Sequence, residues 1–184
     1  MHEDLHEFER WLLHRYSDIP QADSASLRDC VYLHHLVKNV KPKKILEIGT
    51  WIGKSTYALA LAGDPAEVHT IDENGFMNMW VEIPNYTHNI FRYNMTSLEF
   101  FKQNKNEFDF IFIDGIIKED DIKEIFNCTS NKFNIVFHDF YFEDSKDKGT
   151  KNVSNFIDAC TVHDCEFLFE SDLGQCCARL EITK

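Results

Sequence analysis

A glycine-containing loop follows one of the apolar runs of the sequence. The run Lys44–Ile48 leads directly into Gly49, and Gly53 follows four residues later. Gly49 lets the backbone turn sharply, and Gly53 lets a ligand or the next helix approach closely. This order of strand, loop and helix is typical of a nucleotide-binding first loop in an α/β sheet.

The residues around the glycines narrow the choice of nucleotide. Trp51 stands where the dinucleotide fingerprint G-x-G-x-x-G requires a glycine, and its bulk crowds a pyrophosphate. A P-loop is also disfavoured, because no glycine stands five residues before Gly53, which precedes Lys54. We therefore expect a cofactor without a pyrophosphate rather than NAD, although a nicotinamide-dependent oxidoreductase on a similar sheet stays an alternative.

Acids end the apolar runs that follow. Asp72 closes the run Glu67–Ile71 about 20 residues after the loop, where a carboxylate accepts hydrogen bonds from both hydroxyls of a ribose. Asp114 closes a second run, and His138 and Asp139 close a third. Because the carboxyl ends of parallel strands form one ligand crevice, we expect Asp114, His138 and Asp139 to converge.

These three side chains permit two kinds of chemistry. Asp114 and Asp139 with His138 can hold a divalent ion such as Mg²⁺, which orients a substrate hydroxyl and lowers its pKa. Alternatively, His138 or Asp139 removes the proton without a metal. The sequence leaves both open.

The elements that must position these residues alternate along the chain. The expected strands are 44–48, 67–71, 89–93, 108–113 and 133–137. The expected helices between them are 55–62, 77–81, 97–103 and 120–127. This alternation predicts repeated βαβ units and a parallel sheet covered on both faces.

The end of the chain is expected to add an antiparallel hairpin. A helix over 153–160 leads into strands at 166–170 and 176–182, and so short a loop lets the two strands pair directly. The predicted fold class is therefore α/β, Rossmann-like and doubly wound. Its sheet is mostly parallel and seven-stranded, with an antiparallel C-terminal edge and helices on both faces.

Two helices are expected before the first strand. Apolar residues recur at helical spacing over 4–16, and a second helix begins near Ser26, whose hydroxyl pairs with Asp29 as a cap. We interpret the chain as a single domain over 1–184. Within it, the helices of 1–41 form a lid or substrate side, and 42–184 forms the cofactor-binding core.

Composition limits the function classes. The 184 residues include 19 Lys and Arg against 31 Asp and Glu, and the net charge of −12 argues against a nucleic-acid or anionic-membrane surface. No apolar run approaches the roughly 20 residues that span a bilayer, and the N-terminus lacks the features of a signal peptide. We therefore expect a cytoplasmic protein with reduced cysteines.

Taken together, the motifs resemble those of class I S-adenosylmethionine-dependent methyltransferases. The resemblance lies in Glu47–Thr56, Asp72, 112–115 and 136–140, and it extends from about residue 43 to the C-terminus. More narrowly, the sequence resembles the methyltransferase-24 group, which is related to macrocin O-methyltransferase and cephalosporin hydroxylase proteins. The resemblance implies an enzyme that uses S-adenosylmethionine to methylate an oxygen of a small molecule or sugar.

The resemblance also implies roles for individual residues. The loop would line the methionine part of the cofactor, Asp72 would hold its ribose, and residues 94–96 would lie beside the adenine. The implied cofactor-binding residues are Glu47, Gly49, Thr50, Trp51, Gly53, Ser55, Asp72, Asn94, Met95 and Asp114. Asp114, His138 and Asp139 are implied as catalytic residues, with Asp114 and Asp139 as the ligands of a divalent metal.

One segment departs from the group. After the Ile-Asp-Gly of 113–115 the chain continues with Ile116 and Ile117, where the group commonly has an acidic residue and a His that can act as base. This departure keeps open an alternative, a non-catalytic S-adenosylmethionine-binding regulatory or partner protein. The expected partner is a small-molecule or glycan acceptor, and an oligomer is compatible with the sequence.

Overall fold

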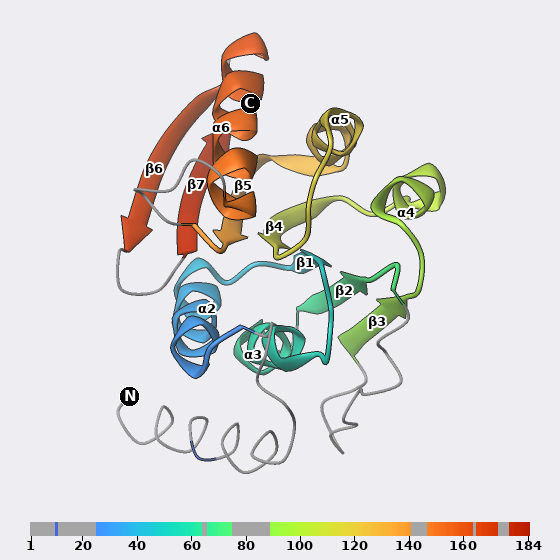
Figure 1. The fold of residues 1–184 in the computed structure, drawn as a ribbon, viewed down its shortest axis with the longest axis vertical. Helices are drawn as coiled ribbons and strands as arrows, with labels where there is room; N and C mark the ends of the chain where they lie inside the picture. Colours follow the sequence, from blue (N-terminus) through green and yellow to red (C-terminus); the bar gives the residue numbers. More distant parts are fainter. Residues whose placement is uncertain are drawn as a thin grey trace.

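The computed structural model describes residue 10 and residues 25–63, 66–74, 89–140, 147–163, 165–172 and 177–184. Within this part of the chain, the strands are β1 (Lys44–Ile48), β2 (Glu67–Ile71), β3 (Ile90–Tyr93), β4 (Phe108–Ile113), β5 (Thr129–His138), β6 (Glu166–Asp172) and β7 (Cys177–Thr183). The helices are α2 (Leu27–Val40), α3 (Lys54–Gly63), α4 (Ser97–Gln103), α5 (Glu119–Asn127) and α6 (Lys148–Val162). Figure 1 shows one sheet with α2 and α3 on one face and α4, α5 and α6 on the other, which confirms the predicted fold class.

The direction of winding reverses at β1. The strand order is β3-β2-β1-β4-β5-β7-β6, and β1 pairs in parallel with both β2 and β4. The chain therefore adds β2 and β3 on one side of β1, and then adds β4 and the later strands on its other side. In doubly wound sheets, ligands bind at the carboxyl ends of the strands beside such a switch point.

The expected C-terminal hairpin is present, and its second strand lies next to β5. β7 pairs antiparallel with both β5 and β6, so the antiparallel strand lies inside the sheet. The expected antiparallel C-terminal hairpin is therefore confirmed, with β6 at the edge of the sheet. One face of β7 packs in the core, with Ala178, Leu180 and Ile182 fully buried.

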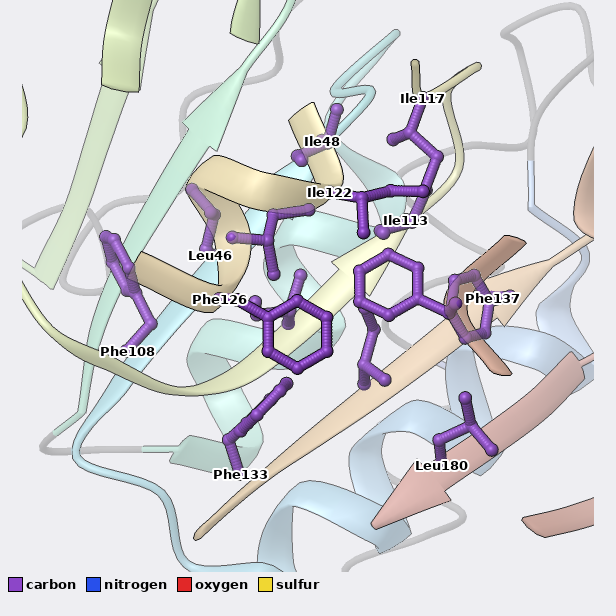
Figure 2. Close-up of a cluster of buried hydrophobic side chains, with 14 of the residues drawn as sticks. Leu46, Ile48, Phe108, Ile113, Ile117, Ile122, Phe126, Phe133, Phe137 and Leu180 are labelled. Atoms are coloured by element: carbon purple, nitrogen blue, oxygen red, sulfur yellow. The ribbon is translucent and has the colours of Figure 1, made fainter. Parts of the chain in front are cut away.

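Apolar side chains from the sheet and α5 form a core cluster beneath the end of β5. Phe133 and Phe137 of β5 are fully buried, and Figure 2 shows them beside Phe126 of α5. Full burial of a side chain of this size stabilises the fold by roughly 1.5–3 kcal/mol. This packing fixes the strands that end at Asp114 and His138.

The expected and observed elements differ chiefly at polar helix and strand starts. β1, β2, β4 and α4 have the expected bounds. In contrast, α6 begins at Lys148 rather than at 153, and β5 begins at Thr129 rather than at 133. The first residues of α6 and of β5 are polar, so they lack the regular spacing of apolar residues from which a helix or strand is predicted.

The expected cap of α2 is confirmed. The backbone amide of Asp29 donates to Ser26 Oγ at 3.2 Å, and that of Ser26 donates to Asp29 Oδ2 at 2.9 Å. The expected helix over 77–81, and the one over 4–16 apart from the helical Arg10, lie outside the described residues. Of the helices that are described, none is both long and apolar enough to cross a membrane.

Candidate active site

A cleft of about 420 Å³ opens at the carboxyl ends of β1, β2 and β4. Its size suits a small-molecule ligand, and its position is that expected beside the switch point of the sheet. The residues that line it include Gly49, Asp72, Met95, Thr96, Leu98, Asp114, Gly115, Ile116, Asp121 and Lys148. Four of the residues expected at a cofactor therefore meet in one cleft, namely Gly49, Asp72, Met95 and Asp114.

Gly49 sits where the first loop touches the end of β4. Its φ is 101°, and a Cβ atom there would lie 3.0 Å from both the carbonyl carbon of Asp114 and the amide nitrogen of Gly115. The amides of Asp114 and Gly115 donate to the carbonyl of Ile48 at 2.9 and 3.0 Å. Only glycine fits this close approach without strain.

Asp72 fixes the conformation of the same loop. Its Oδ2 accepts hydrogen bonds from the backbone amides of Thr50 at 3.0 Å and Trp51 at 2.8 Å. Its Oδ1 accepts one from the amide of Asn74 at 2.9 Å. Trp51 has a φ of 48°, a left-handed conformation that this pair of hydrogen bonds supports. Asp72 thus joins the end of β2 to the loop and still lines the cleft.

Glu47 lies behind the loop rather than in the cleft wall. It is fully buried, and its carboxylate accepts hydrogen bonds from Ser55 at 2.6 Å, from Thr70 at 2.6 Å and from Thr56. Burial raises the pKa of Glu47 to about 7, against the effect of these three hydroxyl donors. Glu47 and Ser55 therefore hold β1, β2 and α3 together, and neither is among the residues that line the cleft.

The other expected cofactor residues belong to the loop or its surroundings. Gly53 has a φ of 81°, and its amide donates to the carbonyl of Thr50 at 2.8 Å, which closes the loop before α3. Met95 lines the cleft, whereas its exposed neighbour Asn94 does not. Thr50, Trp51 and Gly53 shape the loop from behind the cleft surface.

His138 is surrounded by three carboxylates. Its Nδ1 lies 3.0 Å from Asp114 Oδ1 and 3.0 Å from Asp139 Oδ1, and its Nε2 lies 3.2 Å from Asp29 Oδ2. Burial alone would lower the pKa of His138, but the hydrogen bonds to Asp114, Asp139 and Asp29 outweigh it and raise the pKa to about 12. His138 is therefore an imidazolium at neutral pH, with both ring nitrogens directed at carboxylates.

The ammonium group of Lys148 completes this cluster. Its Nζ donates to Asp114 Oδ1 at 2.8 Å and to Asp139 Oδ2 at 3.0 Å. The hydrogen bond from His138, with the charge of Lys148, lowers the pKa of Asp139 to about 2 despite partial burial. Asp139 also has a φ of 55°, an uncommon conformation at the end of a strand that directs its carboxylate into the cluster.

Sequence reasoning missed two members of this cluster, Asp29 and Lys148. Asp29 was identified only as a cap of α2, and nothing local indicates its contact with His138. Lys148 stands in a polar stretch before residue 153, where the helical spacing of apolar residues begins, so the sequence pattern gives no sign that it belongs to α6.

Part of the cluster has the composition of a metal site. Ligand atoms of Asp114, His138 and Asp139 lie within 4.8 Å of one another. However, Lys148 already binds the two carboxylates, and a charged imidazole has no lone pair to offer a metal. With Lys148 in this place, the cluster does not fit a divalent ion.

The sequence matches one family of known proteins. Residues 46–140 match a family described as "Methyltransferase domain". The search of curated proteins finds no match to the sequence. The matched family segment contains Asp72, Asp114 and Asp139 together with the first loop.

Several solved structures with similar folds are methyltransferases. An O-methyltransferase from Bacillus cereus in complex with S-adenosylhomocysteine has a TM-score of 0.72 and 19% identity, covering 97% of this chain and 91% of its own. The O-methyltransferase TomG from Streptomyces achromogenes, in complex with S-adenosylmethionine, has a TM-score of 0.68 and 18% identity, covering 97% and 88%. A methyltransferase from Podospora anserina bound to S-adenosylhomocysteine has a TM-score of 0.67 and 15% identity, covering 97% and 86%. At these identities the likeness establishes a shared fold.

Proposed function

The chain belongs to this methyltransferase family, and from that premise we propose that it transfers a methyl group from S-adenosylmethionine to an oxygen atom of a small-molecule acceptor. The observation that carries the proposal is the cleft itself, in which Gly49, Asp72 and Asp114 meet at the switch point of the sheet. Structures of similar fold that were solved with S-adenosylmethionine or S-adenosylhomocysteine support this cofactor.

The chemistry of the cleft wall suits the parts of such a cofactor. Met95, Leu98 and Ile116 offer apolar surface for a flat base, and Ile116 is 75% exposed with no other described role. Asp72 offers carboxylate oxygens to ribose hydroxyls, and Asp114 offers negative charge to a sulfonium. We assign the adenine to the apolar wall and the methyl-bearing sulfur to the end near Asp114.

The residues beyond Asp114 can orient an acceptor. When bound, S-adenosylmethionine would supply an electrophilic methyl group, which an aligned acceptor oxygen would attack in line while the carbon–sulfur bond breaks and S-adenosylhomocysteine leaves. The carboxylate of Asp139 is 34% exposed and is held by His138 and Lys148, so it can accept a hydrogen bond from an acceptor hydroxyl. In this assignment His138 and Lys148 position Asp114 and Asp139.

The carboxylates around His138 affect which group can accept the proton of the acceptor hydroxyl. An imidazolium cannot accept the hydroxyl proton, so the role of base expected for His138 from the sequence would require it to titrate in the bound state. We propose instead that the proton leaves to Asp139 or to water. A carboxylate that already binds the cationic groups of His138 and Lys148 is a weak base, which favours an acceptor with an acidic hydroxyl, such as a phenol, over a sugar.

Other expectations about partners and location stay predictions. A glycan acceptor, an oligomer and a cytoplasmic location belong to this group. So does a lid or substrate side formed by residues 1–41, of which 1–9 and 11–24 lie outside the described residues. The alternative of a non-catalytic cofactor-binding protein is not favoured, because the matched family is one of methyltransferase domains. The nicotinamide alternative gains no support from the similar structures.

The proposed function is tested by transfer of a labelled methyl group. The protein is incubated with methyl-labelled S-adenosylmethionine and either a pool of phenols or a pool of polyols, and labelled product is counted. We expect label in the phenol pool, reduced roughly tenfold or more by Asp139→Asn. Absence of label in both pools, from a protein that binds the cofactor, would instead support the non-catalytic alternative.

A further inference from the structure

Lys148 occupies the place between two carboxylates that a divalent ion would need. Its Nζ donates to Asp114 Oδ1 at 2.8 Å, to Asp139 Oδ2 at 3.0 Å and to the carbonyl oxygen of Asp114 at 2.5 Å. An ammonium group has three N–H donors, so these contacts use all of them. A magnesium or manganese ion would have to bind the same two carboxylates and would compete with the ammonium for them.

The fold holds Lys148 in this position. The next residue, Gly149, lies so close to the end of β5 that a Cβ atom there would be 2.2 Å from the carbonyl oxygen of His138. One turn later, the buried Asn152 donates to the carbonyl of Gly115 at 3.0 Å. The first turn of α6 is thus packed against the ends of both β4 and β5.

The charges of the cluster lead to the same conclusion. Asp29, Asp114 and Asp139 contribute three negative charges, and His138 and Lys148 contribute two positive ones. One net negative charge remains, which is too little to favour a buried divalent ion. Without the ammonium, two net negative charges would remain, equal in size to the charge of such an ion.

We propose that Lys148 is a built-in replacement for a divalent metal, so that this site excludes metal ions and methyl transfer proceeds without one. Lys148 is a positioning residue, which holds Asp114 beside the cofactor and Asp139 beside the acceptor. The role in the reaction rests on the proposed function, whereas the exclusion of metal ions does not.

The test measures Mn²⁺ binding by electron paramagnetic resonance, with no cofactor present. Wild type is compared with Lys148→Ala and with Lys148→Met, which keeps most of the aliphatic stem. Lys151→Ala is the matched control, because it removes the same charge from an exposed position of α6. We expect wild type and Lys151→Ala to bind Mn²⁺ only weakly, and removal of the Lys148 ammonium to tighten binding at least about tenfold. Adding Asp139→Asn to the Lys148 variant should abolish the gain.

Two results would overturn the proposal. One is tight Mn²⁺ binding by wild type, at about micromolar affinity, that Asp139→Asn removes; this result does not depend on whether a Lys148 variant folds. The other is a folded Lys148→Ala or Lys148→Met protein that binds Mn²⁺ no better than Lys151→Ala. Failure of the methyltransferase function would appear separately, as loss of cofactor binding or of methyl transfer with the Mn²⁺ results unchanged.

Discussion

Asp29 Oδ2 lies 3.2 Å from Nε2 of His138, a residue 109 positions later in the chain. The side chains of Asp29 and His138 are only 5% and 9% exposed. The contact therefore joins the start of α2 to the end of β5 where little solvent reaches it. The same carboxylate accepts a hydrogen bond from the backbone amide of Ser26, as part of the cap of α2. The helix that precedes the sheet is therefore part of the candidate active site.

His138 should remain charged well above neutral pH. Its folded-state pKa of about 12 lies above the ordinary 6.5, so the stability it contributes is full below about pH 6.5 and is lost only as the pH rises through about 12. We expect the ¹⁵N chemical shifts of this ring to stay those of an imidazolium from pH 6 to pH 9. A midpoint near pH 6.5 would contradict the three-carboxylate arrangement.

Asp29→Asn tests the contribution of the third carboxylate. The amide still accepts a hydrogen bond from the Ser26 backbone, so α2 keeps its cap, but the negative charge beside Nε2 is lost. We expect the titration midpoint of His138 to fall relative to wild type while staying above neutral pH, because Asp114 and Asp139 remain. An unchanged midpoint would mean that Asp29 has no electrostatic effect on the ring.

Glu47 should make the fold less stable as the pH rises toward neutrality. Its folded-state pKa of about 7 lies above the ordinary 4.5, so its contribution is full below about pH 4.5 and is lost as the pH rises through about 7. At about 1.4 kcal/mol per pKa unit, the loss is on the order of 3 kcal/mol. Glu47→Gln should flatten this part of the pH dependence in urea unfolding, and an equally steep fall in the variant would refute the assignment.

Two glycines at the cleft should respond differently to alanine. Gly49→Ala combines a left-handed φ with a Cβ atom 3.0 Å from backbone atoms, and we expect it to cost roughly 1–3 kcal/mol of unfolding free energy. Gly115→Ala places its Cβ atom 3.5 Å from Ile48, an ordinary contact, and should cost much less. Chemical unfolding of both variants checks this, and equal losses would show that the approach of the first loop to β4 is not tight.

Local patterns predicted the strands and the residues that end them. Asp72, Asp114 and Asp139 follow apolar runs, and the parallel order of β1, β2 and β4 brings the first two to one cleft. Apolar residues that recur every two residues predict a strand, and those that recur every 3.6 residues predict a helix. This spacing identifies such elements because the buried face of each requires apolar residues.

The features that the sequence did not predict depend on tertiary contacts. The orientation of Glu47 away from the cleft depends on hydroxyls from α3 and β2, and the place of Lys148 depends on how closely Gly149 approaches β5. No repeating pattern of neighbouring residues in the sequence indicates either contact. The position of β7 inside the sheet likewise depends on which strand of the hairpin pairs with β5, and the loop length leaves this open.

Binding of S-adenosylmethionine, measured by isothermal titration calorimetry, tests the central claim most directly. We expect micromolar affinity for wild type, a loss of roughly tenfold or more with Asp72→Ala, and no loss with Glu166→Ala, an exposed acid on β6. Added Mg²⁺ should leave the affinity unchanged, because Lys148 occupies the place of the ion. Absence of measurable binding by folded wild-type protein, with or without Mg²⁺, would contradict the methyltransferase function.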